Sequence, residues 1–361
     1  GDANVNLSID NVSVKEIQVD VPRIDFTDDT TGHLLLEPQS ANLIRYSEDF
    51  SNSYWQKIGS ILAPNAITSP DGNLNASKMI ADTSLYDHFL RTTPSFSVND
   101  YSFSIYAKKG EYNFLVLSRI GSTIRTYFDL ENGTLGTVAS GVTASIKDVG
   151  NGWFKCEATY TYSSGTVLDI NVAKENGVIE FTGDGTSGIY IWGAQLEQNS
   201  YATSYIPTSG STVTRNQEIC NNSGTAQDFN SEEGVLYWEG KTPYDNTASR
   251  RISLSDGSIS NRVSLEFDEL IENKLKAFIT RNGASEVLEY TAPNLSIYNK
   301  IAIKWKANDF AIWFNGSEVV IVTTEPRVPV GLTELSFDGG NNANNFYGKA
   351  KNLKVFKRAL T

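Results

Sequence analysis

Polar and aromatic side chains that could bind a saccharide gather in one short stretch of this chain. The stretch runs from Tyr86 to Arg91, and further Tyr and Arg side chains recur around the two strands expected after it. Guanidinium and phenol groups suit the recognition of hydroxyl or carboxylate groups on an acidic glycan, whereas the alternative is ordinary side-chain pairing across a sheet face. The candidate binding residues are Tyr86, Asp87, His88, Arg91, Tyr112, Arg119, Arg125 and Tyr127.

Trp313 is a further candidate, because it is out of phase with the apolar residues of its strand. In FAIWF from Phe310, the apolar residues at alternate positions share one strand face and Trp313 takes the other. A flat ring outside the core can hold the apolar side of a pyranose ring, or it can pack under a covering loop. Trp305 is in phase with the isoleucines of NKIAIKW from Asn299, so the sequence predicts that Trp305 lies in the core.

Catalytic chemistry has little support in the sequence. His33 and His88 are the two histidines, and neither has a Cys or His partner at the spacing of a zinc site. No Gly-x-Gly-x-x-Gly run or phosphate loop follows an expected strand, which leaves nucleotide chemistry unsupported. The sequence therefore predicts a protein that is not an enzyme and that requires no cofactor.

The overall charge narrows the range of partners. Of 361 residues, 30 are Lys or Arg and 42 are Asp or Glu, so the formal net charge is −12. We expect no nucleic-acid or anionic-membrane partner, since both need clustered basic side chains. No apolar run approaches the roughly eighteen residues that span a bilayer, so we expect no membrane insertion. Cys156 and Cys220 allow at most one disulfide, and two free thiols are the simpler interpretation.

The elements that must position these residues are β-strands. Apolar and polar residues alternate with a period of two in many short runs, which is typical of half-buried strands. Asn-Gly pairs at residues 132–133, 151–152, 282–283 and 315–316 predict tight hairpins between strands. The clearest alternating runs are YSFSIY from Tyr101, WFKCEATYTY from Trp153, SGIYIWGAQLE from Ser187, RVSLEF from Arg262, NKIAIKW from Asn299 and FAIWFNGSEVV from Phe310.

The chain divides at a segment without apolar periodicity. PTSGSTVTRN, residues 207–216, carries small polar residues, which is typical of a linker. Each side has the size and strand spacing of a β-sandwich. We therefore predict an all-β chain of two tandem antiparallel β-sandwiches, over residues 23–214 and 215–361, with residues 1–22 as the linker and remnant of a preceding module.

Two separated motifs in the first half carry a family resemblance. GHLLLEPQSANLIRYSEDFSNSYW, residues 32–55, and TGDGTSGIYIWGAQLEQNSYATSYIPT, residues 182–208, resemble a module that recurs in bacteriophage tail, fibre and head-spike proteins and in some secreted bacterial proteins. The resemblance implies a carbohydrate-binding-like jelly roll. LSIDNVSVKEI, residues 7–17, is similar to the closing strand of family 4 and family 9 carbohydrate-binding modules, so we expect the chain to be a segment of a longer protein.

The second half resembles laminin-G and concanavalin A-like lectin and glucanase domains. The resemblance rests on EEGVLYWEG from Glu232, KIAIKWKANDFAIWFNGSEV from Lys300 and NFYGKAKNLKVFKRALT from Asn345. Family 16 glycoside hydrolases with this fold carry Glu-x-Asp-x-(x)-Glu on one strand. Glu266-Phe267-Asp268 starts that pattern, but Leu270 and Ile271 stand where the second acid would be. The resemblance therefore does not extend to catalysis.

The jelly-roll resemblance also leaves a structural calcium ion open. Glu48 and Asp49 occupy the opening strand, where such modules place a ligand, and Asp184 lies in the TGDGTSG turn. Asp184 binds an ion or only shapes its turn. Trp192 and Gly193 stand where an Asp of the closing strand would complete the site. The sequence therefore offers Glu48, Asp49 and Asp184 as calcium candidates.

Together these observations predict a non-catalytic module for glycan binding and adhesion. The resemblance implies a place in a phage receptor-binding or fibre protein, or in a secreted bacterial adhesin, at the virion surface or outside the cell. The expected partner is a cell-surface or extracellular polysaccharide, and a homo-oligomer such as a trimeric fibre would fit. Two alternatives stay open: a spacer or decoration on a virion, and an accessory region of a polysaccharide-degrading enzyme whose catalytic module lies outside this sequence.

Overall fold

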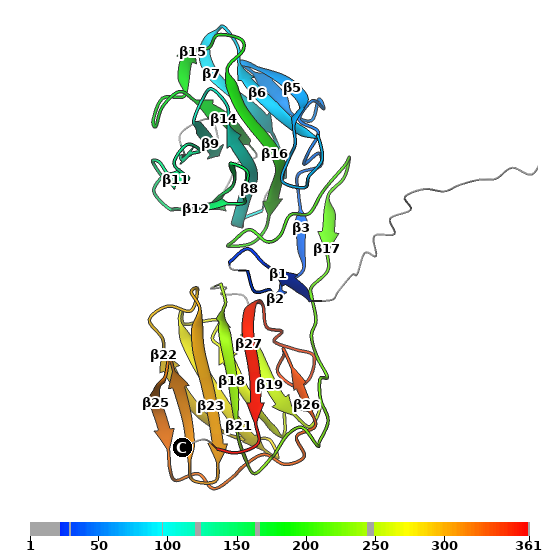
Figure 1. Ribbon diagram of the computed structural model, residues 1–361, viewed down its shortest axis with the longest axis vertical. Coiled ribbons are helices and arrows are strands. Elements are labelled where there is room, and N and C mark those ends of the chain that lie inside the picture. Colours follow the sequence, from blue (N-terminus) through cyan, green and yellow to red (C-terminus); the bar gives the residue numbers. More distant parts are fainter. Residues whose placement is uncertain are drawn as a thin grey trace, which may run out of the picture.

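The chain folds into two lobes built from β-strands (Figure 1). The computed structural model describes residues 22–28, 30–95, 97–119, 124–162, 167–243 and 249–359. Within these residues every regular element is a strand and every strand ladder runs antiparallel, so the predicted all-β class with two tandem sandwiches is confirmed. The remnant predicted over residues 1–22 lies, apart from Pro22, outside the described residues. None of the described residues forms a helix long and apolar enough to cross a bilayer.

The N-terminal sandwich consists of two facing sheets, which we call the β8 sheet and the β9 sheet. The β8 sheet has the order β12 (Val142–Asp148), β13 (Trp153–Tyr162), β8 (Asn99–Lys109), β16 (Gly188–Glu197), β6 (Ala76–Ala81) and β5 (Ser60–Ile67). The β9 sheet has the order β11 (Thr134–Leu135), β10 (Ile124–Asp129), β9 (Phe114–Arg119), β14 (Leu168–Ala173), β7 (Leu85–Thr92) and β15 (Glu180–Thr182), and β4 (Gln56–Ile58) also pairs with β7.

One hydrophobic core fills the space between these two sheets. Phe103 and Ile105 of β8 face Leu117 of β9 and Ile170 of β14, and all four are fully buried. Their polar neighbours along each strand point to the outer faces, because successive side chains of a strand alternate between faces. Cys156 lies in this core as a free thiol, and burial raises its pKa well above the ordinary value.

The C-terminal sandwich also consists of two sheets, the β18 sheet and the β20 sheet. The β18 sheet has the order β1 (Arg23–Asp25), β2 (His33–Leu36), β27 (Gly348–Phe356), β18 (Glu233–Lys241), β23 (Asn299–Lys306), β24 (Phe310–Phe314) and β25 (Ser317–Val322). The β20 sheet has the order β22 (Ala284–Thr291), β21 (Lys274–Arg281), β20 (Arg262–Phe267), β19 (Arg250–Ser255) and β26 (Glu334–Ser336). Trp305 is fully buried between them, which confirms its predicted place in the core.

Three of the four predicted hairpins close with positive φ at both residues of the Asn-Gly dipeptide, whereas at residues 132–133 only Gly133 has positive φ. Asn151, Asn282 and Asn315 have φ angles of 54°, 49° and 50°, and each following glycine also has positive φ. Two consecutive residues with positive φ match the type I′ turn, whose twist fits antiparallel strands. These dipeptides connect β12 to β13, β21 to β22 and β24 to β25.

The first two strands belong to the C-terminal sheet, although the next strands build the other lobe. β2 pairs with β27, from Leu34 opposite Ala350 to Leu36 opposite Gly348. β3 (Ser40–Asn42) then pairs with β17 (Val213–Arg215), so the chain's two passages between the lobes lie side by side (Figure 1). The strand pairing thus adds residues 23–36 to the C-terminal sheet, while the domain boundary at residues 214 and 215 stays a prediction.

The buried side chain of Asn42 ties the start of the N-terminal sandwich to its end. Its Nδ2 donates to the carbonyl oxygens of Ala194 at 3.1 Å and Ile206 at 2.8 Å. Its Oδ1 accepts from the backbone N–H groups of Ile44 at 3.0 Å and Leu196 at 3.1 Å. One side chain thus joins the segment after β3 to β16 and to the segment that follows β16.

Glu197, at the end of the WGAQLE run, is a second buried polar tie. Its carboxylate accepts from Ser40 Oγ at 2.6 Å, Gln195 Nε2 at 2.7 Å and the Thr203 N–H at 2.9 Å. Burial raises the pKa of Glu197, while these donors oppose that effect. The opening and closing motifs of the first half are therefore in direct contact. Ser40 and Glu197, one from each motif, stabilise the fold.

Glu37, from the EPQ motif, fastens the junction between the lobes. Its carboxylate accepts from Arg23, from Arg215 Nη1 at 2.8 Å and from the Ser204 N–H at 2.9 Å. Its own N–H donates to Glu218 Oε2 at 2.8 Å, and Glu218 in turn binds Arg23. Because Glu37 and Glu218 are buried, the loss of Arg23 would leave their charges without this partner.

Replacement of Asn42 by alanine is expected to destabilise the N-terminal sandwich by about 3 kcal/mol, because it leaves several buried backbone groups without partners. The measurement is amide hydrogen exchange of β8 and β16 peptides of the full chain across a urea series. Asn216→Ala serves as control, since Asn216 is exposed. Equal exchange in the two variants would contradict this role for Asn42.

Candidate functional site

Four of the residues predicted from sequence lie together on the outer face of the β9 sheet. Leu90 and Phe128 point into the core, so the alternating residues of β7 and β10 point the other way. These outward residues include Asp87 and Arg91 on β7 and Arg125 and Tyr127 on β10. Tyr127 is buried there in a small apolar cluster with Val116 and Ile179, so it supports the face and is not available to a ligand. We call this surface the polar face; it comprises Asp87, Phe89, Arg91, Arg125, Tyr127, Asp169, Asn171 and Glu180.

Two arginines lie across the polar face in fixed positions. Arg91 forms a two-pronged pair with Asp169, with both N···O distances at 2.7 Å, and its guanidinium lies 4.6 Å from the ring centroid of Phe89. Arg125 reaches from β10 to Asp87 on β7, where Nη2 lies 3.5 Å from Oδ2. The two arginine side chains are 26% and 27% exposed, so each presents part of its guanidinium to solvent.

Carboxylates outnumber guanidiniums on the polar face. Burial raises the pKa of Asp87, and the neighbouring Glu180 and Asp169 raise it further, while Arg125 lowers it. The pKa of Arg91 is raised by its hydrogen bonds to Asp169. Three carboxylates against two guanidiniums give the face many acceptors and a slightly negative balance.

The face also holds polar groups in fixed orientations. Asn171 Nδ2 donates to Ser118 Oγ at 3.1 Å and to the Val116 carbonyl oxygen at 3.3 Å. The side chains are held in place, and the buried Nε of Arg125 is left unsatisfied among the described residues.

Asp169 and Asn171 were absent from the sequence-based candidates. They alternate with Leu168, Ile170 and Val172, whose side chains all pack into the core. That alternation is the signal that could have found them, because it places Asp169 and Asn171 on one outward face.

The other sequence candidates of the N-terminal sandwich are not part of the polar face. Tyr86 is 53% exposed beside it, whereas His88 is fully buried and its Nε2 lies 2.9 Å from the Phe181 carbonyl oxygen. Tyr112 packs edge-on against the Phe181 ring, and Arg119 donates to the Thr161 carbonyl oxygen. His88 therefore holds the sandwich together and is not available to a ligand.

Trp313 lies in the other lobe. It is partly buried on the outer side of the β18 sheet, opposite Ala302 of β23 and Glu318 of β25. The structure therefore does not bring Trp313 to the candidates of the N-terminal sandwich.

The three calcium candidates each bind groups of the protein. Glu48 accepts from Tyr205 Oη at 3.0 Å and from Asn75 Nδ2 at 3.2 Å. Asp49 accepts from the backbone N–H of residue 51, and Asp184 accepts from the backbone N–H groups of residues 186 and 187. Among the described residues, no group of three or more His, Cys, Asp and Glu side chains is arranged to hold a metal ion. A calcium site stays a prediction.

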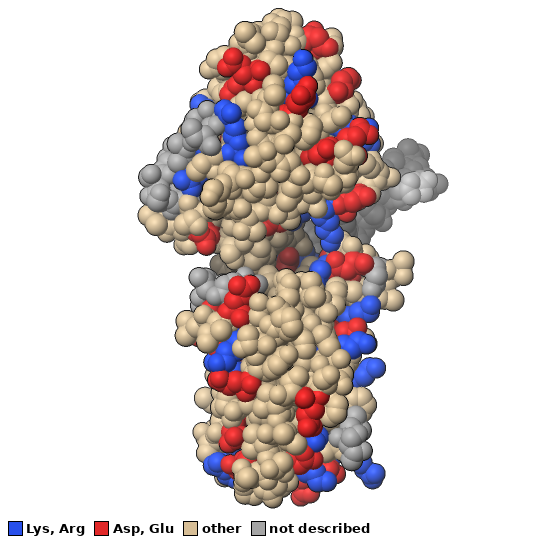
Figure 2. Space-filling model, turned by 90° about the vertical axis from the view of Figure 1, so that its left-hand side faces the viewer, with Lys and Arg blue, Asp and Glu red and all other residues tan. Residues whose placement is uncertain are grey.

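A cleft of about 290 Å³ lies at the junction of the lobes, where Figure 2 shows a hollow at the waist. Its lining includes Tyr205, Lys147 and Lys349. Both lysines bind Asp28, with Nζ···O distances of 3.5 Å for Lys147 and 2.7 Å for Lys349. The charged groups of this cleft thus hold the lobes together, which makes the polar face the stronger binding candidate.

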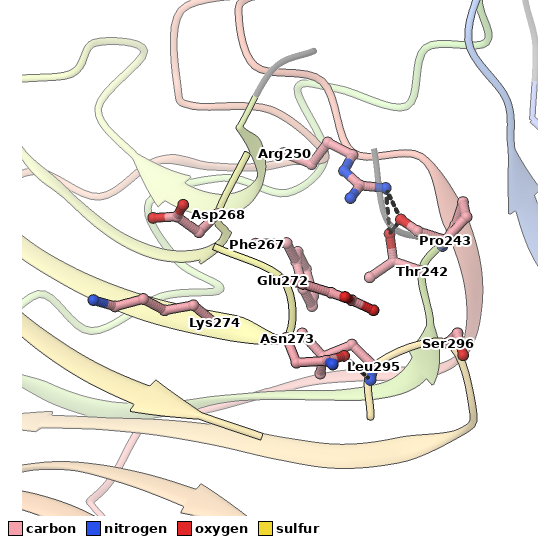
Figure 3. A pocket seen from close by; sticks show the side chains of 10 residues that line it. All are labelled: Thr242, Pro243, Arg250, Phe267, Asp268, Glu272, Asn273, Lys274, Leu295 and Ser296. Atoms are coloured by element: carbon pink, nitrogen blue, oxygen red, sulfur yellow. Dashed lines mark hydrogen bonds between the residues drawn. The ribbon is translucent and has the colours of Figure 1, made fainter. Parts of the chain in front are cut away.

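A smaller cavity, of about 20 Å³, lies at the end of β20 in the C-terminal sandwich (Figure 3). Asp268 Oδ1 accepts from the N–H groups of Leu270 and Ile271 at 2.7 and 2.8 Å, so this carboxylate shapes its turn. Glu272 extends toward Thr242, away from Asp268 (Figure 3). The described residues that line this cavity do not present the facing carboxylates that glycoside hydrolysis needs.

Comparisons with known proteins give distant likenesses. No family model and no curated protein matches the chain. Among solved structures, CBM40 of the Ruminococcus gnavus IT-sialidase is similar, with 16% identity, a TM-score of 0.32 and coverage of 40% of this chain and 90% of that one. The same module bound to α2,3-sialyllactose has 17% identity, a TM-score of 0.33 and the same coverage. Domains LG4-5 of the mouse laminin α1 chain have 10% identity and a TM-score of 0.28, covering 78% of this chain and 90% of that one.

The pKa of Asp87 provides a test of the polar face. In Arg125→Gln we expect this pKa to rise further, because the substitution removes the positive charge that opposes burial and the neighbouring carboxylates. The measurement is a carbon-13 NMR titration of the Asp side-chain carboxyls of the full chain. Arg281→Gln is the control, since Arg281 is exposed in the other lobe.

The same shift has a consequence for stability. At pH values between the unfolded and the folded pKa of Asp87, the native state binds more protons than the unfolded state does. The contribution of Asp87 to the free energy of unfolding therefore falls as pH rises through that window. Arg125→Gln should steepen this fall. An Asp87 pKa that is unchanged in the variant would show that Arg125 and Asp87 do not interact in solution.

Proposed function

We propose that this chain is a non-catalytic glycan-binding module and that the polar face is its binding surface. The observation that carries the proposal is the placement of Arg91 and Arg125, both partly exposed, among fixed carboxylate and amide groups on one sheet face. Sugar hydroxyls both donate and accept, so they match a surface on which guanidinium donors alternate with carboxylate acceptors.

The charge balance of the face favours a neutral saccharide. Asp87, Asp169 and Glu180 repel an added negative charge, and each arginine already has a carboxylate partner. Neighbouring hydroxyls of a pyranose can bridge such a pair without introducing charge. Tyr86, with half of its surface exposed, offers a ring for the apolar side of the sugar.

The biological setting that we propose is a surface-attachment protein, either a phage receptor-binding or fibre protein or a secreted bacterial adhesin, acting on cell-surface or extracellular polysaccharide. Only parts of Arg91, Arg125 and Asp87 are exposed on this face, whereas Asp169 and Asn171 are buried, so few direct contacts are available and the intrinsic affinity is low. Repetition of the module in an oligomer such as a trimer would convert weak contacts into strong attachment.

The experiment is a glycan-array screen of the full chain that includes neutral and acidic polysaccharides and α2,3-sialyllactose, in calcium and in chelator. We expect neutral glycans to bind, and Arg125→Gln to weaken the binding by about tenfold, the loss expected for a hydrogen bond to a charged group. Affinities of wild type and variant are then measured by calorimetry on the strongest glycan.

Arg281→Gln is the matched control, since it removes the same charge from the exposed end of β21. A folded wild-type chain that binds no glycan would favour the spacer function instead. Binding that is equally strong in Arg125→Gln would move the site away from the polar face. Signal lost in chelator would support the calcium prediction.

A further inference from the structure

The outer face of the β20 sheet carries small hydroxyl side chains beneath larger charged ones. Ser253 of β19 lies directly opposite Ser264 of β20, and Ser264 lies opposite Phe278 of β21. The neighbours of these residues along each strand, such as Leu254 and Leu265, pack into the core. Ser253, Ser264 and Phe278 therefore share the face that points away from the core.

Two arginines flank the ring of Phe278 on this face. The guanidinium carbon of Arg251 lies 4.9 Å from the ring centroid, and that of Arg262 lies 5.7 Å away. Arg251 is neutralised, because it pairs with Glu266. Arg262 donates to the Gly339 carbonyl oxygen and forms no ion pair with any described residue.

Three buried donors on this face have no acceptor in the part of the chain that the structure describes. Ser253 Oγ, Ser264 Oγ and Arg262 Nε are without a hydrogen-bond partner among the described residues. Both serines are fully buried and Arg262 is 6% exposed. Native proteins satisfy nearly all buried polar groups, so a cluster of unused donors indicates an acceptor that binds there.

The electrostatics specify the kind of acceptor. Burial, and after it the like charge of Arg251, lowers the pKa of Arg262 to about 10, although Glu266 and Asp338 act in the opposite direction. An added anion would offset both unfavourable effects.

The nearest carboxylates have other partners. Glu266 binds Arg251 and lies 3.6 Å from Lys276, and Asp338 Oδ1 accepts from the Gly340 N–H at 2.6 Å. Neither supplies the acceptor that the three unused donors lack.

We propose that Arg262, Ser253 and Ser264 bind the oxyanion of an acidic saccharide, with the partly exposed ring of Phe278 against the sugar. The oxyanion is a carboxylate or a sulfate ester, since either offers several acceptor oxygens to donors on one side. This site lies in the C-terminal sandwich, shares no residue with the polar face and goes beyond the function proposed above. The chain would then hold neutral and acidic sugars on different lobes.

The test is calorimetry on the full chain with four probes: sodium sulfate, a uronic-acid oligosaccharide, a sulfated oligosaccharide and their neutral parent. We expect one or both acidic oligosaccharides to bind at least about tenfold more tightly than the parent, and the one that binds identifies the oxyanion. Equal affinities for the acidic oligosaccharides and the neutral parent would overturn the proposal. Sulfate that binds as tightly as the sulfated oligosaccharide would overturn the saccharide part.

Arg262→Gln and Ser264→Ala should each lower the affinity for the acidic oligosaccharide by about tenfold, while Arg281→Gln leaves it unchanged. Arg262→Lys keeps the charge but not the planar fork of donors, and it replaces Arg262→Gln if that variant does not fold. If Ser264→Ala alters the melting temperature but not the affinity, the donors hold only water and the proposal is wrong.

The variants of the two lobes separate this proposal from the function proposed for the polar face. Arg125→Gln should leave the binding of acidic oligosaccharides intact, and Arg262→Gln should leave the binding of neutral glycans intact. If only one of these two variants affects its own class of glycan as expected, the site of the other variant is wrong.

Discussion

Closure of the N-terminal sandwich by the buried amide of Asn42 is the constraint on which the rest of that lobe depends. Asn42 and β16 are far apart in sequence, and this side chain fixes how they meet. Because β16 pairs with both β8 and β6, its position sets the β8 sheet and the core above it. The β9 sheet packs on that core, so the arrangement of the polar face follows from the same closure.

The strands and turns were predictable because local patterns determine them. A period of two shows which residues face the core, and an Asn-Gly pair shows where φ is positive. The roles of Glu37 and Asn42 were not predictable in this way. Both are polar residues in an opening motif, and a sequence does not show that a polar side chain is buried among partners more than 150 residues away.

The candidate site was partly predictable for the same reason. The alternation on β7 places Asp87 and Arg91 on one face. Arg125 meets Asp87 only because the fold places β10 in the same sheet as β7, with β9 and β14 between them. Arg262 shows the opposite case. It appears in the sequence as one polar member of an ordinary alternating strand, and only its burial and the lack of an acceptor for its Nε among the described residues distinguish it.

The pairing of β2 with β27 has a mechanical consequence. β1 and β27 lie in one sheet with β2 between them, so tension applied between residues 23 and 356 is borne by hydrogen bonds of the C-terminal sandwich. The N-terminal sandwich leaves and rejoins this lobe through two adjacent connections, β3 and β17 (Figure 1). The N-terminal sandwich therefore does not carry this tension, and a pull along the chain would leave the shape of its polar face unchanged.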